Sequence, residues 1–237
     1  MSYKERKNKR GFDETRPMEA KVGVIKRADG SAYFKIGNTW AYAAVYGPRN
    51  LHPKFLQDPS TGILRCHYNM MPFSGSGERV RPGGSRRSKE ISMVTEKALL
   101  PVLSLEEFPN TVVDVFIEFP QTEAGSRCAG ITAAAMALAD AGLAMKDMIA
   151  AVSVGRVDDK LVVDLDYSEE AYEGGPVADI PVAVMPSSGK ITLLQMDGLV
   201  KKEMLKDLLA KAKAACAKIY EVQKRALKEK YTRVDEE

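Results

Sequence analysis

The segment EAGSRCAGITAAA (123–135) has residue types suited to binding a phosphate group. Gly125, Ser126 and Arg127 stand directly before an alanine-rich stretch that predicts a helix. Backbone N–H groups at the start of a helix lack partners, and the helix dipole is positive there. With the Ser126 hydroxyl and the Arg127 guanidinium, the segment predicts a phosphate site. Alternatively, Gly125 only makes a turn, Ser126 caps the helix and Arg127 lies at the surface.

A second group consists of acids. Between Asp158 and Asp179 the sequence has eight acidic residues and a single base, Lys160. Asp179 directly precedes the apolar stretch IPVAV, and Glu173 lies six residues earlier, across a GGP turn. Paired carboxylates suit Mg²⁺ binding or proton transfer. The alternative for these acids, except Asp179, is a solvated loop.

A third group is basic. Arg86 and Arg87 follow a loop rich in Gly and Arg and begin a predicted helix capped by Ser85. Guanidinium groups beside free N–H donors suit phosphodiester oxygens. Arg65 and His67 lie two apart on a predicted strand, share one face, and are candidates to join them. The alternative is that all four are ordinary surface or packed residues.

Composition narrows the class of protein. The 237 residues are 45% hydrophobic and 28% charged, which is ordinary for a soluble globular protein. The longest apolar-to-small run, residues 128–139, is too short to span a membrane, and the N-terminus lacks the apolar segment of a secretory signal. Three widely spaced cysteines and two histidines predict neither disulfides nor a multi-histidine metal site. The P-loop pattern GxxxxGK[ST] is absent, which argues against a standard ATPase or GTPase. We expect a reduced, cytoplasmic protein.

The elements that must position these residues follow from hydrophobic periodicity and turn signals. Residues 1–17 predict a basic N-terminal tail, for which a solvated tail is the simplest interpretation. Strands are expected at 22–28, 31–37, 39–47, 63–73, 111–119, 148–157, 160–166, 180–186 and 190–196, and helices at 86–103, 127–141 and 201–230. This order predicts one α+β domain over residues 1–237, with mixed β-sheets packed against a few helices and a long C-terminal helix.

Four motifs occur together in an order typical of one family. They are SRRSKEIS, GSRCAGITAA, DLDYSEEAYEGGPVADIPVAVMP and ITLLQMDG. Over essentially its whole length the chain resembles the RNase PH family of phosphorolytic 3′→5′ exoribonucleases. Within that family it is most similar to the catalytic subunits of the archaeal exosome.

The resemblance implies roles for the candidate residues. Gly125, Ser126 and Arg127 would bind inorganic phosphate, which is a co-substrate in this family. Asp179 matches the second of two family carboxylates, which serve as Mg²⁺ ligand or general acid. The first lies six residues earlier, at Glu173; in a shifted alignment it falls on Ala171, where there is no carboxylate. The Arg86-Arg87 pair would hold the RNA 3′ end.

The resemblance also implies a reaction and partners. Phosphate attacks the last phosphodiester of a single-stranded RNA and releases a nucleoside diphosphate, and the reverse reaction adds untemplated 3′ tails. The implied assembly is a hexameric ring in which the chain alternates with a related inactive RNase PH-like subunit, below RNA-binding cap subunits. Two other functions stay open from the sequence: a non-catalytic RNA-binding subunit of the same ring, and a ribosomal or other RNA-binding module.

Overall fold

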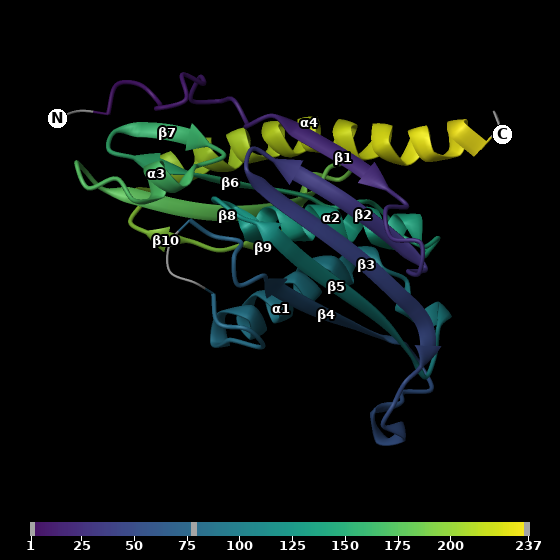
Figure 1. Ribbon diagram of the computed structural model, residues 1–237. Helices are drawn as coiled ribbons and strands as arrows, with labels where there is room; N and C mark the ends of the chain where they lie inside the picture. Colours follow the sequence, from purple (N-terminus) through teal and green to yellow (C-terminus); the bar gives the residue numbers. More distant parts are fainter. Residues whose placement is uncertain (1–2, 77–79, 235–237) are drawn as a thin grey trace.

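Two β-sheets, each of five strands, form the frame of the molecule (Figure 1). The computed structural model describes residues 3–76 and 80–234. The first sheet has the strand order β1-β2-β3-β5-β4, and all neighbours are antiparallel except β4 and β5. Its strands are β1 (Met18–Val22), β2 (Gly30–Ile36), β3 (Thr39–Asn50), β4 (Ile63–Met70) and β5 (Thr111–Gln121).

The second sheet follows the order β10-β8-β6-β7, and β9 pairs with β8. All of its neighbours are antiparallel. Because β8 is a central strand, it brings Asp179 opposite Asp197 of β10. The strands are β6 (Ala150–Val157), β7 (Lys160–Val163), β8 (Val177–Met185), β9 (Lys190–Leu194) and β10 (Asp197–Gly198).

Helix α2 (Ser126–Asp140) lies in the core and contacts strands of both sheets. Every residue of α2 except Arg127 and Ala139 is buried, and most are small. A side chain at Gly130 would come within 3.1 Å of the Phe119 ring. The small residues therefore let the sheets approach the helix closely, and Arg127 is left as the one charged side chain at its N-terminal end that reaches solvent.

Two further helices cover the sheets. Helix α1 (Arg86–Leu99) packs on β4 and is capped by reciprocal hydrogen bonds between Ser85 and Ser88. Helix α4 (Lys202–Val234) runs along the second sheet and reaches β1 (Figure 1). Its buried face follows helical spacing through Leu208, Ala212, Ala215, Cys216, Ile219, Gln223 and Ala226.

The predicted α+β class, with mixed sheets, a few helices and a long C-terminal helix, is confirmed. The first strand was expected at 22–28 but is β1, because Gly23 takes a positive φ of 69° and ends it. Helix α1 stops at Leu99, four residues early, and a 3-10 turn containing Pro101 follows. A proline lacks the N–H that would continue the helix. The short helix α3 (Tyr167–Glu170) was not predicted.

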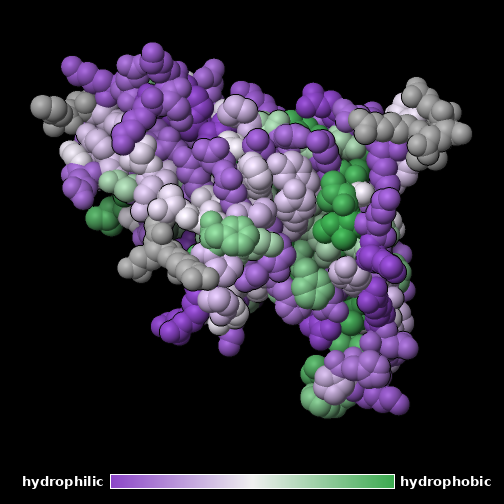
Figure 2. Space-filling view, in the orientation of Figure 1, coloured by the Kyte–Doolittle hydropathy of each residue, from purple (hydrophilic) through white to green (hydrophobic). Residues whose placement is uncertain are grey.

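The outer surface is mostly polar, as Figure 2 shows for one face. The loop between β3 and β4 projects from the body and carries exposed Phe55 and Leu56 (Figure 1). Within the described residues, no helix has both the length and the hydropathy needed to cross a membrane.

The solvated-tail interpretation of residues 1–17 is wrong for two of its arginines, Arg6 and Arg16. Arg6 is 1% exposed and Arg16 is 4% exposed. Both lie against the acidic run that follows β7, where Asp164, Asp166 and Glu169 are themselves buried. Opposite charges far apart in the sequence therefore fold onto each other, and the solvated-loop interpretation is wrong for these three acids as well.

Candidate active site

A cavity of about 500 Å³ lies where the start of α2, the start of α1 and the strands β8 and β10 meet. Its lining includes Gly125, Ser126 and Arg127 from α2, together with Arg87 and Asp179. The fold therefore brings one member or more of each of the three predicted groups to a single place.

The start of α2 is built to leave donors free. Gly125 is the N-cap, with φ 66° and ψ 24°, a left-handed conformation that glycine adopts without strain. In the part of the chain that the structure describes, no side chain caps this end of the helix. The Ser126 hydroxyl accepts a hydrogen bond from the Tyr68 hydroxyl at 2.7 Å, which fixes its position. This geometry suits an anion placed before the helix.

Arg127 has donors that no described residue uses. Its Nη2 atom lies 3.3 Å from Glu90 Oε2, and the side chain is 23% exposed. Its buried Nε has no hydrogen-bond partner among residues 3–76 and 80–234. A guanidinium has five N–H donors, so Arg127 keeps capacity for a bound anion.

Two carboxylates form the opposite wall. Asp179 accepts a hydrogen bond from the Ser153 hydroxyl on β6. Burial raises the pKa of Asp179, although Ser153 and the charge of Arg127 oppose the shift. Burial, and next the charge of Asp179, raise the pKa of Glu170 to about 7. Acids with displaced pKa values that share a cavity are typical of functional sites.

Glu173 does not take the position expected for the first carboxylate. It is exposed and is not among the residues that line the cavity, whereas Glu170 is. The difference arises because helix α3 ends at Glu170 and the following loop carries Glu173 away. A signal for this helix was present, since Asp166 and Glu169 form the reciprocal pair of a capping box. Ala171, on which the shifted alignment falls, directly follows Glu170 and is not among the lining residues.

The four basic candidate residues do not lie together in the structure. Arg87 lines the cavity; Arg86 is exposed and is not among the lining residues. Arg65 and His67 share the outer face of β4, as expected, but there both lie against Asp114. Arg65 binds its two oxygens at 2.7 and 2.9 Å, and the His67 Nε2 lies 3.7 Å from Oδ1. The structure does not bring this pair to the cavity.

Sequence reasoning did not pick out several other lining residues, among them Ser153, Gln195 and Asp197. Gln195 and Asp197 belong to the ITLLQMDG motif, which was noted without a role for these side chains. Ser153 lies in the apolar stretch that forms β6, and only the pairing of β6 with β8 places it beside Asp179.

The cavity fits a magnesium ion through few protein ligands. Across the described residues, no group of three or more His, Cys, Asp and Glu side chains is arranged to hold a metal. Mg²⁺, however, is usually bound by one or two carboxylates together with substrate phosphates. Asp179, with Glu170 beside it, meets that requirement.

Comparisons with known proteins identify the family of the chain. Family models for domain 1 and domain 2 of the 3′ exoribonuclease family, RNase PH, match residues 14–144 and 147–215. The chain is 51% identical to exosome complex component Rrp41 of Methanopyrus kandleri, covering 92% of this chain and 90% of that protein. It is 53% identical to the protein of the same name from Thermococcus kodakarensis, covering 94% and 88%.

Two solved structures share the fold. The crystal structure of rice Rrp46 has a TM-score of 0.83 at 22% identity, covering 94% of this chain and all of that one. A chain of the Archaeoglobus fulgidus exosome with RNA bound to the active site has a TM-score of 0.76 at 23% identity, covering 92% of both chains. Together with the family models and the Rrp41 relatives, the fold identifies an exoribonuclease of the RNase PH type. The chain belongs to the 3′ exoribonuclease family, RNase PH.

Proposed function

We propose that this chain is a phosphorolytic 3′→5′ exoribonuclease and the catalytic subunit of an RNA-degrading exosome ring. The observation that carries the proposal is the cavity in which the Gly125–Arg127 turn faces Asp179 and Glu170. Family membership and the Rrp41 relatives support it.

The reaction requires two anions to meet in line. An oxygen of inorganic phosphate forms a bond to the phosphorus of the terminal phosphodiester, and the bond from that phosphorus to the preceding nucleotide's 3′ oxygen breaks. The terminal nucleotide leaves as a diphosphate, and the 3′ oxygen takes up a proton. Because phosphate and not water is the acceptor, the reaction is not a hydrolysis. Similar bonds are broken and formed, so the reverse reaction adds 3′ tails.

The chain's contribution is positioning and charge neutralisation. Ser126, Arg127 and the N–H groups at the start of α2 hold the attacking phosphate. We assign Asp179 to a Mg²⁺ ion, which when bound neutralises charge on the reacting phosphates. Glu170, with its pKa near 7, is suited to give the proton to the leaving 3′ oxygen.

Arg86 and Arg87, at the start of α1, hold the RNA 3′ end. Arg65 and His67 are left out of the RNA path because Asp114 already neutralises Arg65. We place the chain in a cytoplasmic heterohexameric ring with a related inactive RNase PH-like subunit and RNA-binding caps. The similarity to subunits of exosome complexes supports this assembly.

The test is phosphate-dependent shortening of a short oligo(A) by the full chain assembled with its ring partner. We expect shortening by single nucleotides when phosphate and Mg²⁺ are both present, and none when phosphate is withheld. A ring that binds the oligonucleotide but never shortens it would show instead a non-catalytic RNA-binding subunit.

A further inference from the structure

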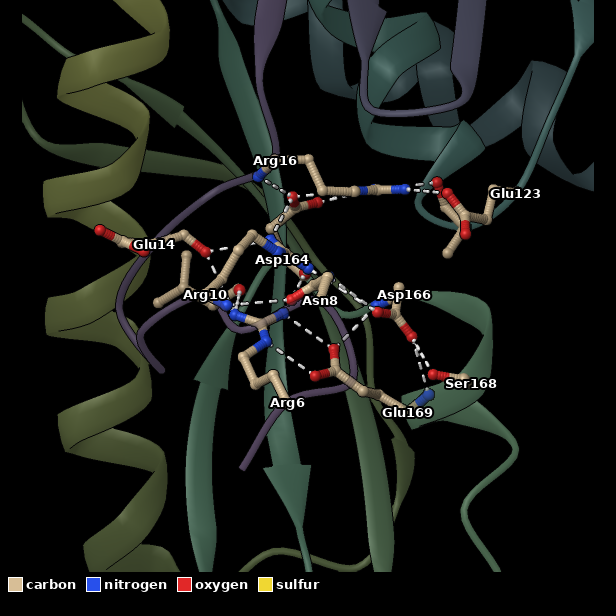
Figure 3. A network of polar contacts seen from close by, with 12 residues as sticks. Arg6, Asn8, Arg10, Glu14, Arg16, Glu123, Asp164, Asp166, Ser168 and Glu169 are labelled. Carbon is tan, nitrogen blue, oxygen red and sulfur yellow. Dashed lines mark hydrogen bonds and ion pairs between the residues drawn. The ribbon is translucent and has the colours of Figure 1, made fainter. Parts of the chain in front are cut away.

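A buried network joins the N-terminal segment to the acidic segment that follows β7 and to Glu123, which lines the cavity (Figure 3). Residues 3–16 contain no strand or helix, yet Arg6 and Arg16 are almost completely buried. A buried guanidinium is costly unless its donors are satisfied. The partners that satisfy Arg16 come from two segments that are far apart in the sequence.

The first partner of Arg16 is the acidic segment that leads to Glu170. Its Nε and Nη2 donate to the two oxygens of Asp164 at 2.9 and 2.7 Å, and its backbone N–H donates to Oδ2 at 2.7 Å. Burial opposes the charge of Arg16, but Asp164 outweighs it and raises the pKa of Arg16. Asp164 directly follows β7 and lies two residues before the N-cap of α3.

The second partner is the turn before α2. Arg16 Nη2 donates to the Ala124 carbonyl at 3.2 Å, and Nη1 lies 3.5 Å from Glu123 Oε2. The Thr39 hydroxyl donates to the same carbonyl at 2.8 Å. Arg16 Nη2 also lies 3.4 Å from where a side chain on Gly125 would begin. Arg16 therefore fixes the peptide that precedes the free N–H groups of α2.

Arg6 and Arg10 also bind acids of the segment that follows β7. Arg6 binds both oxygens of Glu169 at 2.7 and 2.8 Å. Arg10 reaches Asp164 at 3.2 Å and Asp166 at 3.9 Å. Neither Arg6 nor Arg10 has a hydrogen bond to the turn before α2 among the contacts of the described residues. Arg16 is thus the side chain through which the network reaches that turn.

We propose that Arg16 is a positioning residue: it ties the phosphate-binding turn to the segment carrying Glu170, so that phosphate and the acidic wall keep their spacing. This inference rests on the proposed function, in which the turn binds phosphate. Arg16 does not line the cavity and does not touch the reacting groups. Arg16 influences phosphate binding through its hydrogen bond to the Ala124 carbonyl.

The test is Arg16→Lys in the assembled complex. Lysine keeps the charge but lacks the fork that binds Asp164 and Ala124 together. We expect KM for phosphate to rise about fivefold or more, with RNA affinity within about twofold of wild type. Arg10→Lys is the matched control, because it alters the same network without touching the turn, and we expect its KM for phosphate to be unchanged.

A merely structural role gives a different pattern. If Arg16→Lys lowers Tm and kcat but leaves KM for phosphate unchanged, or if Arg10→Lys raises KM equally, the inference is wrong. If Arg16→Lys does not fold, Asp164→Asn replaces it, and an unchanged KM for phosphate in that variant rejects the inference. Wild-type complex without phosphate-dependent activity would instead reject the proposed function.

Discussion

The cavity and the outer face of β4 and β5 both place arginine next to carboxylate, yet the two regions differ in how fully the charges are paired. On the sheet face, Arg65 binds both oxygens of Asp114. In the cavity, Arg127 contacts Glu90 at 3.3 Å, and its buried Nε has no partner among the described residues. A charge that is already satisfied gains little from a ligand, whereas one with free donors gains a great deal.

The carboxylates show the same contrast. In the cavity, burial raises the pKa values of Asp179 and Glu170, although arginine charges oppose both shifts. Among the contacts of the described residues, no guanidinium binds both oxygens of either carboxylate. Residue types alone do not separate a site from a surface ion pair. The unsatisfied groups, which only the fold shows, make the distinction.

The largest effect is expected for Asp179→Asn. The change is nearly isosteric but removes the charge that we assign to Mg²⁺, so kcat/KM should fall on the order of 100-fold, about 2.7 kcal/mol. Single-turnover phosphorolysis on folded, assembled material measures it. Asp114→Asn is the control from the paired region and should remain within about twofold of wild type. Comparable losses in both variants would remove the distinction between the two regions.

Arg127→Ala is expected to raise KM for phosphate about tenfold, or about 1.4 kcal/mol. Its free donors face the small anion, whereas a long RNA has many other contacts. Initial rates against phosphate concentration give the value. Arg65→Ala should leave KM for phosphate unchanged, since the Arg65 guanidinium is paired with Asp114. An Arg127→Ala complex with normal phosphate dependence and much weaker RNA binding would reverse the roles of Arg127 and the α1 arginines.

The α1 arginines offer a finer test. Each lost phosphate contact to single-stranded RNA should reduce the slope of log affinity against log salt by roughly 0.7. We expect this reduction for both Arg86→Ala and Arg87→Ala, measured on rings shown to be intact by gel filtration. Of these two arginines, Arg87 lines the cavity and Arg86 does not. We therefore expect Arg87→Ala, but not Arg86→Ala, to raise KM for phosphate as well. Unchanged salt slopes in both variants would place the RNA path elsewhere.

The smallest effect concerns stability against pH. The pKa of Glu170 is raised to about 7 from an ordinary value near 4.5, so the folded state keeps a proton that the unfolded chain releases. Its contribution to stability is present below pH 4.5 and is lost as the pH rises through 7. Glu170→Gln should therefore gain about 1 kcal/mol relative to wild type between pH 5 and pH 8, a figure reduced for its partial exposure. Urea unfolding of both proteins at the two pH values checks this. If the difference in unfolding free energy between wild type and Glu170→Gln is the same at both pH values, the pKa of Glu170 is not raised.

Sequence patterns were sufficient for much of the site. Gly125 before an alanine-rich helix and Asp179 before an apolar strand are local signals, and the structure brings both to one cavity. Periodicity likewise predicted most strands and helices to within a few residues. The roles assigned to these residues stay predictions until the variants are measured, as does the division of the chain into domains.

The remaining features depend on contacts between distant segments. Sequence reasoning placed the first carboxylate at Glu173, six residues before Asp179. It did not predict helix α3, which ends at Glu170 and places that side chain at the cavity. Arg16 was assigned to a tail because its partner, Asp164, lies 148 positions away in the chain. The pairing of Arg65 with Asp114 depends on the parallel register of β4 and β5, which no local pattern specifies.

The most direct test of the central claim follows the phosphate itself. The assembled complex is given unlabelled oligo(A), Mg²⁺ and radiolabelled inorganic phosphate, and the released nucleotides are separated by charge. If the cavity holds phosphate as the attacking group, the label appears in nucleoside diphosphate, and the Asp179→Asn complex yields none above background. Release of unlabelled nucleoside monophosphate by the wild-type complex would show that water is the acceptor and would contradict the account.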